Sequence, residues 1–405
     1  MPVRIGLIGK TNTGKTTFFN AATLLSAEVS TYPFTTKTPD SAIANAVTVC
    51  VHREFNVQDN PKNSSCLDGW RFIPIEIIDL PGLIKGAWIG KGLGNQFLSV
   101  AAQSDALLHI VDASGSVDID GKITEPDTGD PVADIGDIEE ELAMWYLKMV
   151  EGNREKISRT IRSGAHIADA IVEVMRGVGV KQQHVNAALV EGKLEGKGFD
   201  DWTGEQTKNF AWILRDVSKP TLIVANKMDL PTSARNFRRI QEAYSDLIVV
   251  PSSAEAELTL RRAEHKGLIR YIPGEERFEI LDSGKLEERQ KWALGFIRKA
   301  VLGEYMRTGV QFAINVAVFK LLRMNTVYPV YDPAKMTDKK GNVLPDVYLM
   351  PSGASVSDLA RAIHTQLAKG LLYAVDVRSG LRLPVDYQLK DRDVLSILSA
   401  TRKKA

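Results

Sequence analysis

The sequence predicts an α/β protein: a doubly wound, mostly parallel sheet that is interrupted by a helical domain and followed by a small α+β module. Apolar runs that end in a polar residue or glycine alternate with helical stretches, as in parallel sheets whose strands are buried on both faces. Between Asp112 and Thr221 the chain spends 108 residues, where a parallel crossover needs about a dozen, so a domain is inserted there. Short strands around one helix near the C-terminal end predict the module.

Each expected element follows from the spacing of its apolar residues. Short apolar runs bounded by Gly, Asp, Asn or Ser predict strands, and apolar residues three or four positions apart predict helices. The strands of the main sheet are expected at 3–8, 72–78, 106–111, 221–225 and 247–250, with a first helix at about 14–25. The C-terminal strands are expected at 346–350, 371–375 and 394–398, around a helix at about 356–367 and after a linking helix at about 285–306.

The inserted segment begins as a loop and continues as helices. Residues 113–136 are rich in Gly, Asp, Pro and Ser, which is typical of a loop. Helical spacing from Ile138 to Met149 and from Ile157 to Val174 then predicts an antiparallel helical hairpin or bundle. We therefore expect the sheet domain at 1–136, the helical domain at 137–219, the second part of the sheet domain with the linking helix at 220–305, and the C-terminal module at 306–405.

Composition excludes several classes of protein. A chain of 405 residues with 44% hydrophobic and 25% charged residues is typical of a globular protein of two to three domains. It has no uncharged apolar run of about 18 residues and opens directly on a strand, so we expect a cytoplasmic protein without a membrane segment or signal peptide. Cys50 and Cys66 are its only cysteines, and nothing near them in the sequence completes a metal-ligand pattern, so we expect two reduced thiols.

Charge is distributed unevenly along the chain. Residues 306–405 hold 15 Lys and Arg against 8 Asp and Glu, whereas residues 1–305 hold 36 against 42. A basic module on an acidic body is typical of a protein that binds a polyanion. A basic surface that serves only solubility is the alternative.

The first motif is a phosphate loop. Residues 9–16 read GKTNTGKT, which fits the pattern GxxxxGKT between a strand and a helix. In this P-loop the glycines let backbone N–H groups close around phosphates at a helix N-terminus. Lys15 is expected to reach the β- and γ-phosphates as a catalytic residue, and the Thr16 hydroxyl to bind Mg²⁺. The residues expected to bind phosphate are Asn12, Thr13, Gly14, Lys15, Thr16 and Thr17.

A second group of residues is expected at the γ-phosphate. The sequence DLPG at 79–82 follows a strand, so Asp79 is expected to hold Mg²⁺ through water and the Gly82 N–H to face the γ-phosphate. Thr35 or Thr36 is expected to bring a hydroxyl to Mg²⁺, and the sequence does not decide between them. Leu83 stands where many small GTPases have a glutamine that orients water, so we expect slow hydrolysis by the isolated protein.

The third and fourth motifs predict which nucleotide base the protein binds. The sequence NKMD at 226–229 closes a strand, and the Asp229 carboxylate can accept hydrogen bonds from N1–H and N2–H₂ of guanine, which adenine cannot offer. The sequence SSA after the next strand can direct a backbone N–H at guanine O6. The residues expected to bind guanine are Asn226, Lys227, Asp229, Ser252, Ser253 and Ala254.

With these motifs in place, the chain resembles a known family. The phosphate loop, YPFTT at 32–36 and the long stretch that starts with DLPGLIKGAWIGKGLGNQF resemble the Obg-related GTPases. The insertion after Asp112 and the ending from LPDVYLMPSGASVSDLARAI onward are similar to the YchF subfamily, in its archaeal or Ygr-type branch, which carries a C-terminal TGS domain. The resemblance implies a TRAFAC-class nucleotide-binding core, an association with ribosomes or translation, and a hydrophobic residue in place of the catalytic glutamine.

The expected function is that of a monomeric GTP-hydrolysing switch that uses Mg²⁺ and binds a ribosome or ribosomal RNA through its basic module. A rival hypothesis is an RNA- or ribosome-binding regulatory protein in which nucleotide is mainly a structural ligand. A third is an ATPase like bacterial YchF, although family members that prefer ATP lack the NKxD pattern that this chain keeps. Potassium-stimulated GTPases of the wider class place an asparagine at the position of Asn12, so K⁺ is a possible second cofactor.

Overall fold

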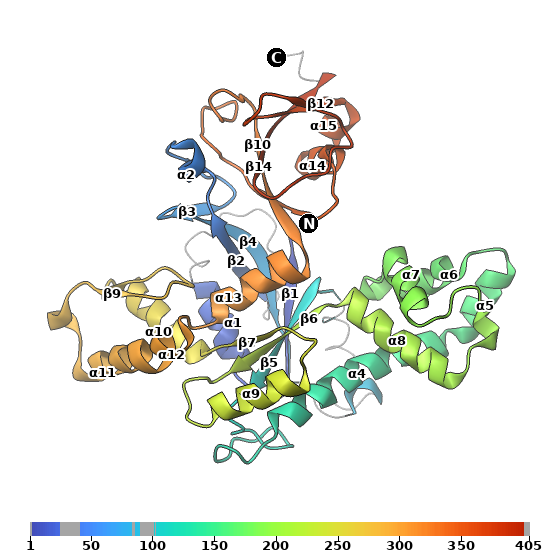
Figure 1. Cartoon of the computed structure of the whole chain (residues 1–405), viewed down its shortest axis with the longest axis horizontal. Coiled ribbons are helices and arrows are strands. Elements are labelled where there is room, and N and C mark those ends of the chain that lie inside the picture. Colours follow the sequence, from blue (N-terminus) through green and yellow to red (C-terminus); the bar gives the residue numbers. More distant parts are fainter. Residues whose placement is uncertain (1, 25–40, 83–85, 90–100, 102, 401–405) are drawn as a thin grey trace.

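The computed structural model describes residues 2–24, 41–82, 86–89, 101 and 103–400. In Figure 1 a central sheet domain carries a helical domain on one side, a smaller helical extension on the other and the C-terminal module at the top. Within the part of the chain that is described, no helix is both long and apolar enough to cross a bilayer.

The central sheet is mostly parallel. Among the described residues, its main path runs in the order β2-β4-β1-β5-β6-β7, with β3 paired to β4. In the described part of the chain, β2 and β3 pair with β4 in the antiparallel sense, and the pairings along β4-β1-β5-β6-β7 are parallel. The strands are β1 (Arg4–Ile8), β2 (Ser41–Val49), β3 (Ser65–Leu67), β4 (Trp70–Asp79), β5 (Ala106–Asp112), β6 (Thr221–Asn226) and β7 (Val249–Pro251).

Helices cover both faces of this sheet. Successive residues of β6 point to opposite faces, so Leu222 and Val224 join one buried cluster while Ile223 and Ala225 join another. The first cluster is covered by α1 (Lys15–Thr23), α10 (Ala254–His265) and α13 (Val310–Asn315), and the opposite face by α4 (Pro131–Gly152) and α9 (Ser233–Ala243). The predicted doubly wound fold is therefore confirmed.

The inserted helices form a unit with its own core. Phe199, Trp202 and Phe210 lie at its centre, with ring centroids 4.9 Å apart in both neighbouring pairs. Helix α4 begins at Pro131, capped by Asp130, so the loop that the sequence predicts up to residue 136 is shorter. After α4 come α5 (Arg154–Arg162), α6 (Ile167–Met175), α7 (Gln182–Glu191) and α8 (Gly204–Ser218).

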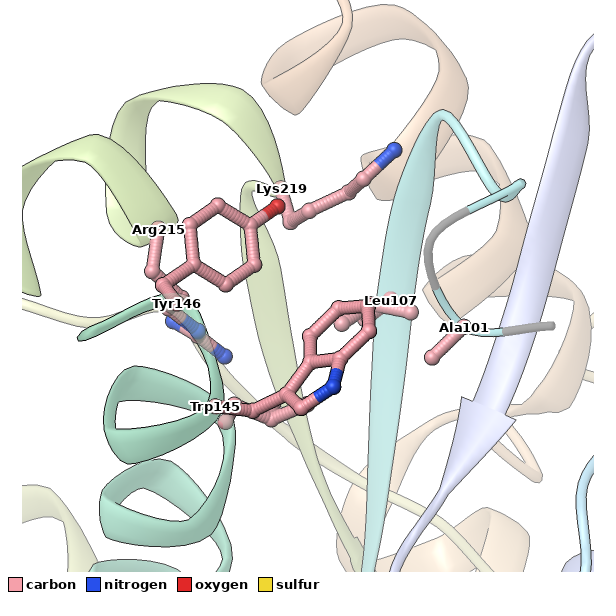
Figure 2. A pocket seen from close by; sticks show the side chains of 7 residues that line it. Ala101, Leu107, Trp145, Tyr146, Arg215 and Lys219 are labelled. Carbon is pink, nitrogen blue, oxygen red and sulfur yellow. The ribbon is translucent and has the colours of Figure 1, made fainter. Parts of the chain in front are cut away.

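Helix α4 joins the insertion to the sheet. Its C-terminal half contributes Tyr146 to the core of the insertion, while Ile138 and Leu142 pack against the sheet. Buried Arg215 of α8 fixes the junction, because its guanidinium pairs with Glu139 of α4 at 2.7 Å and donates to Thr221 at 2.8 Å. Figure 2 shows the small apolar pocket left at this junction, which lies between Ala101, Leu107, Leu142, Trp145, Tyr146, Arg215 and Lys219.

One segment that we expect in the C-terminal module belongs to the sheet domain instead. Helix α13 and the π-helical turn that follows it (Val316–Leu321) place six apolar side chains in the core beside α1 and α10. Gln311 and Asn315 also bond the backbone of the edge strand β2. The expected boundary at residue 306 therefore precedes a core helix, and the division between the two units falls after about residue 322.

The C-terminal module is a curved sheet that packs on one helical pair. Of the residues described, five strands form it in the order β11-β10-β14-β12-β13. Leu359 and Ala360 pack on this sheet, and a capping box between Ser355 and Asp358 starts their helix. The elements are β10 (Met324–Val330), β11 (Tyr348–Pro351), α14 (Val356–Ile363), α15 (Thr365–Lys369), β12 (Leu371–Asp376), β13 (Arg382–Leu383) and β14 (Asp393–Ser399).

The smaller extension lies in the sequence between α10 and α13, both of which belong to the sheet domain. Tyr271, Phe278 and Leu294 belong to its buried cluster. It contains the hairpin β8 (Ile269–Arg270) and β9 (Glu279–Ile280), then α11 (Glu288–Phe296), a π-helical turn (Ile297–Leu302) and α12 (Gly303–Tyr305).

Candidate nucleotide-binding site

The phosphate loop joins β1 to α1 and faces the carboxyl ends of the parallel strands. Gly14 has φ of 99°, and a Cβ atom at this position would clash with Nδ2 of Asn226. Asn12 also adopts a left-handed conformation, with φ of 63°. Thr13 closes the loop by donating from its hydroxyl to the Lys10 carbonyl at 3.1 Å. This backbone needs glycine at position 14, since a side chain would add both strain and overlap.

Lys15 points into the loop. Its Nζ donates to the carbonyls of Gly9 at 3.1 Å and Lys10 at 2.5 Å. Burial lowers the pKa of Lys15 to about 8, and the nearby Asp79 carboxylate partly opposes this shift. Among the described residues its hydrogen-bond partners are two neutral carbonyls, so a phosphate placed in the loop would be a stronger partner.

Two oxygen-bearing side chains meet beside the loop. The Thr16 hydroxyl donates to Oδ2 of Asp79 at 2.7 Å, so the first helix and the end of β4 bring their predicted metal ligands together. Hydroxyl and carboxylate oxygens suit Mg²⁺, which prefers hard ligands and keeps several waters. Thr17 follows on α1, half-buried.

A loop of the insertion lies against the phosphate loop. Asn12 donates from Nδ2 to the carbonyl of Gly121 at 2.9 Å. A Cβ atom on Gly82 would clash with Oγ1 of Thr11, which places the predicted γ-phosphate glycine directly beside the phosphate loop. Lys10 forms a buried ion pair with Asp134 on α4. Thr35, Thr36 and Leu83 lie outside the described residues.

Asn226 joins the phosphate loop to the two guanine motifs. Its Nδ2 donates to the Thr13 carbonyl at 2.9 Å, and its Oδ1 accepts from the Ala254 N–H at 3.0 Å. Both halves of its amide are therefore used, and it is almost fully buried. An asparagine suits this position because one side chain must donate and accept at the same time.

Asp229 is half-buried at the predicted base position. Its Oδ1 accepts from the Ser253 hydroxyl at 2.6 Å. Ser253 also caps α10, and Ser252 sits beside it with its N–H bonded to the Ala225 carbonyl. The two predicted guanine motifs thus form one hydrogen-bonded unit at the ends of β6 and β7.

The sequence interpretation did not include Asp112, although it orders the same site. This buried carboxylate accepts from the backbone N–H groups and the hydroxyls of Ser114 and Ser116, and from Nζ of Lys227 at 3.0 Å. Lys227 itself has φ of 65°. The signal in the sequence is an Asp that ends a strand and is followed by Ser at two and four positions, an arrangement that favours side chain to backbone bonds.

A second group of side chains supports the SSA segment at 252–254, which we call the guanine loop. The Thr308 carbonyl accepts from the Ser253 N–H at 2.8 Å. The Thr308 hydroxyl donates to buried Glu257, which also accepts from the hydroxyl of Tyr271 at 2.8 Å. Burial and the Glu257 carboxylate raise the pKa of Tyr271 well above its usual value, so this phenol stays a donor. The segment before α13 therefore holds the guanine loop in place.

Comparisons with known proteins agree with this arrangement. A model of 50S ribosome-binding GTPases matches residues 4–145, a model of the G4-motif-containing domain of Obg-like YGR210-like GTPases matches 224–332, and a TGS-domain model matches 335–399. A GTP-binding protein of Methanocaldococcus jannaschii is 41% identical over 402 residues, which is 98% of this chain and 99% of that protein. The chain belongs to the YchF subfamily of Obg-related GTPases. Its YGR210-like model places it in the Ygr-type branch.

Other members of the family include proteins that are named as ATPases and proteins that are named as GTPases. The ribosome-binding ATPase YchF of Bacillus subtilis is 30% identical to this YchF-type GTPase over 279 residues, 66% of this chain and 70% of that one. The crystal structure of a GTP-binding protein from Pyrococcus horikoshii is 33% identical, with a TM-score of 0.79 over 98% of this chain and all of that chain. The Schizosaccharomyces pombe YchF GTPase shares the fold at 18% identity, with a TM-score of 0.57 over 98% of each chain.

Proposed function

We propose that this YchF-type GTPase hydrolyses Mg·GTP slowly on its own and works as a nucleotide-controlled switch on ribosomes. The observation that carries the proposal is the pair of hydrogen bonds made by the Asn226 amide. They connect the guanine motifs to the Thr13 carbonyl of the phosphate loop. A ligand that fills both ends of this unit must carry a base and a phosphate chain. Base choice and phosphate binding are then parts of one site.

The base would be guanine because of Asp229. Its carboxylate accepts one hydrogen bond from Ser253 and has capacity left for the N1–H and N2–H₂ donors of guanine. Adenine presents no such donors, and an unpaired carboxylate in a closed site is costly. Asp229 therefore argues against an ATPase activity like that of bacterial YchF.

Phosphoryl transfer in such a site depends on charge and position. Lys15 would leave its two carbonyl partners and bond the β- and γ-phosphates, while Gly82 would offer its N–H to the γ-phosphate. Thr16 and Asp79 would hold Mg²⁺, which supplies positive charge at the phosphate oxygens when it is bound. Leu83 cannot orient water, which is why we expect slow turnover without a partner.

The C-terminal module supports a polyanionic partner. Exposed basic side chains there lie over aromatic rings: Arg382 over Tyr373 at 4.7 Å and Lys390 over Tyr387 at 6.0 Å. Such pairs combine a phosphate-binding cation with a ring on which a base can stack. The same pairs favour the rival function, an RNA-binding regulator for which nucleotide is a structural ligand.

Turnover separates the two functions. Binding of GTP, GDP, ATP and ADP is compared by calorimetry, and single-turnover hydrolysis of GTP is then measured with and without ribosomes from the same cell. The switch requires guanine preference and a rate that rises with ribosomes. A rate that ribosomes leave unchanged, together with ribosome binding that ignores the nucleotide, would favour the regulator. Equal affinity for both bases would contradict the guanine assignment.

A further inference from the structure

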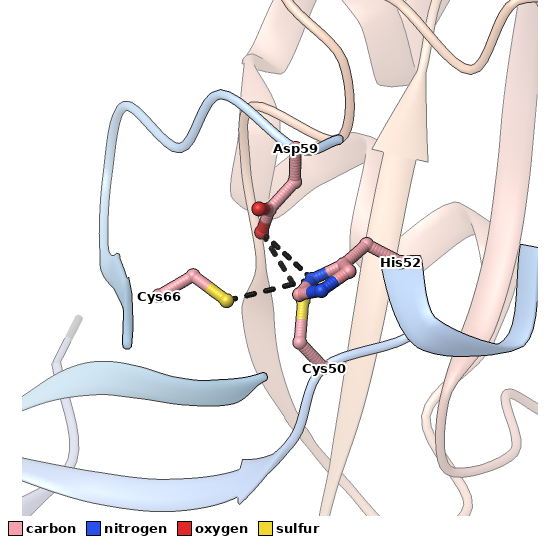
Figure 3. A group of neighbouring side chains, drawn as sticks. All are labelled: Cys50, His52, Asp59 and Cys66. Carbon is pink, nitrogen blue, oxygen red and sulfur yellow. Dashed lines mark hydrogen bonds and ion pairs between the residues drawn. The ribbon is translucent and has the colours of Figure 1, made fainter. Parts of the chain in front are cut away.

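Four side chains of the kinds that bind metal ions, all from residues 50–66, meet beside the central sheet. Cys50 follows β2, His52 opens the short helix α2 (His52–Phe55), Asp59 lies in the next segment and Cys66 belongs to β3. Figure 3 shows the four side chains pointing toward one another. The ligand atoms of all four lie within 4.8 Å of one another. None of these residues takes part in the nucleotide site.

The spacing of the four groups fits a tetrahedral metal. The Cys50 Sγ and Asp59 Oδ2 atoms are 3.3 Å apart, His52 Nδ1 and Asp59 Oδ2 are 3.3 Å apart, and Cys66 Sγ and His52 Nδ1 are 3.5 Å apart. Bond lengths of about 2.0 Å to nitrogen or oxygen and about 2.3 Å to sulfur place neighbouring ligands of tetrahedral zinc roughly 3.3–3.8 Å apart. Three of the six separations among the four ligand atoms already fall in this range, and the others lie within 4.8 Å, so an ion would draw the ligands only slightly closer.

The burial and the charge of the cluster also favour a bound zinc ion. Cys50 and Arg71 are fully buried, and Asp59 is nearly so. Arg71 donates to Oδ2 of Asp59 at 2.9 Å, as the outer partner of a ligating carboxylate does. Two thiolates, one carboxylate, neutral His52, Zn²⁺ and the guanidinium together carry no net charge. A buried cluster with that balance avoids the cost of an uncompensated ion.

The chemistry of the donors selects the metal. Two sulfur ligands and an imidazole suit zinc, whereas magnesium and calcium take oxygen ligands. A disulfide between Cys50 and Cys66 would explain neither His52 nor Asp59, and both cysteines are free. Four protein ligands fill a tetrahedral shell, which is typical of structural zinc and leaves no position for a substrate.

We propose that Cys50, His52, Asp59 and Cys66 form a structural zinc site. The site organises the segment that docks the C-terminal module. Within that segment, the N–H groups of Asn60 and Lys62 donate to the carbonyls of Val343 and Pro345 at 2.8 and 2.7 Å. Arg71 reaches from the cluster to the Leu344 carbonyl at 2.8 Å. Zinc would therefore stabilise the contact between the C-terminal module and the sheet domain. It would not contact the nucleotide.

Metal content tests the proposal on the full chain. The protein is produced with zinc in the medium and without chelators, and its metals are measured by mass spectrometry. We expect about one zinc ion per chain in the native protein. Replacing the half-buried ligands, in Cys66→Ser and His52→Ala, should weaken zinc binding at least about tenfold in competition with a chelator. His166→Ala removes an exposed histidine elsewhere and should keep the zinc.

Measurements on the unaltered chain keep the test independent of folding defects in the variants. Cobalt exchanged for zinc should give the visible absorption of a tetrahedral thiolate site. Removing the metal with a chelator should speed hydrogen exchange of the Asn60 and Lys62 amides, because these amides bond the module next to the zinc ligands. GTP affinity should stay within about twofold, because no zinc ligand belongs to the nucleotide site. A native protein that takes up no stoichiometric zinc or cobalt, or a Cys50–Cys66 disulfide in freshly lysed cells, would overturn the proposal.

Discussion

At the scale of single residues, the proposed choice of guanine depends on Asp229. Replacing Asp229 with Asn substitutes a donor for one of the carboxylate oxygens, so the side chain no longer pairs with guanine N2–H₂ but can donate to the 2-oxo group of xanthine. We expect GTP affinity to fall at least about a hundredfold, or roughly 2.7 kcal/mol, while XTP affinity rises. Titration of both nucleotides checks this. An Asp229→Asn variant that still prefers GTP would show that the carboxylate does not face the base.

The lowered pKa of Lys15 predicts a pH dependence of nucleotide binding. Burial lowers this pKa to about 8 in the free protein, and phosphates would raise it in the complex. The complex then binds a proton that the free protein has lost above about pH 8, so affinity should fall by up to about tenfold per pH unit there. Calorimetry in buffers of different ionisation enthalpy measures the proton uptake.

A matched lysine serves as the control for this effect. Burial also lowers the pKa of Lys219 to about 8, but its Nζ donates to the Ser104 carbonyl, away from the phosphate loop. Lys219→Met should therefore leave the proton uptake on nucleotide binding unchanged. Nucleotide binding without any proton uptake between about pH 8 and pH 9 would mean that Lys15 does not meet the phosphates.

Asn12 predicts a potassium effect on hydrolysis. Its Nδ2 bonds the Gly121 carbonyl, which holds the side chain beside the phosphate loop, and its Oδ1 oxygen is the expected cation ligand. A monovalent cation there would add positive charge near the β–γ bridge. We expect faster GTP hydrolysis in potassium chloride than in sodium chloride for the native chain and equal rates for Asn12→Ala. Equal rates in the two salts for the native chain would contradict this.

At the scale of elements, the guanine loop depends on the segment before α13. Gly309 has φ of 89°, and a Cβ atom there would clash with the Pro251 carbonyl and lie 2.7 Å from Cα of Ser252. Gly309→Ala should push the guanine loop away from α13. We expect at least a tenfold loss of GTP affinity, about 1.4 kcal/mol, with binding of Mg·tripolyphosphate preserved.

Gly267 provides the control for this substitution. It also has positive φ, 65°, but nothing lies within 4 Å of a Cβ atom at that position. Gly267→Ala therefore adds backbone strain of about 1–2 kcal/mol without a clash and should lower thermal stability but not GTP affinity. If the two variants lose the same GTP affinity, the brace behind the guanine loop has no role in binding.

Much of the fold could be predicted because buried parallel strands have continuous apolar runs. Strand β2 gave no such signal: its alternating small residues, SAIANAVTV, follow the period of an edge strand. Helix α13 was assigned to the wrong unit because its side chains enter a core whose other buried members come from residues 3–77, 108–110 and 222–258. Such contacts depend on topology, and local spacing does not record them.

The same distinction applies to the sites. The phosphate and guanine motifs are short, and each follows one strand, so local patterns predicted their grouping. Both cysteines are free, as expected, but the expectation that nothing near them completes a metal-ligand pattern is wrong. Cys50, His52, Asp59 and Cys66 meet only after β2, β3 and β4 pair. Tertiary structure brings these ligands together, at a spacing that matches no common zinc pattern.

At the scale of the whole molecule, the module is fixed to the body by specific bonds. Arg378 makes a bidentate pair with Glu54 at 2.6 and 3.0 Å, and Arg392 joins the same carboxylate at 3.2 Å. The pairing with Arg378 lowers the pKa of Glu54. Deleting residues 306–405 would remove these contacts and also the core helix α13, so a truncated chain would lose more than its module. Surface substitutions are the better test of what the module binds.

Reversing two charges on the module tests its partner. Arg382 and Lys390 are exposed and lie over tyrosine rings, far in the sequence from the nucleotide site. The double substitution Arg382→Glu and Lys390→Glu should weaken binding to ribosomes at least about tenfold and should lower the slope of log affinity against log salt by about 2, one for each lost phosphate contact. Co-sedimentation at several potassium chloride concentrations measures both quantities.

A charge-matched variant separates a local contact from a general effect of net charge. Lys193→Glu with Lys208→Glu makes the same change on the inserted helical domain, where both lysines are exposed. If RNA phosphates contact the module, this control keeps the native affinity and slope, and GTP binding is unchanged in both double variants. If both variants weaken ribosome binding equally, attraction is set by the overall charge of the chain. If neither does, the basic surface of the module serves another purpose and ribosomes bind elsewhere.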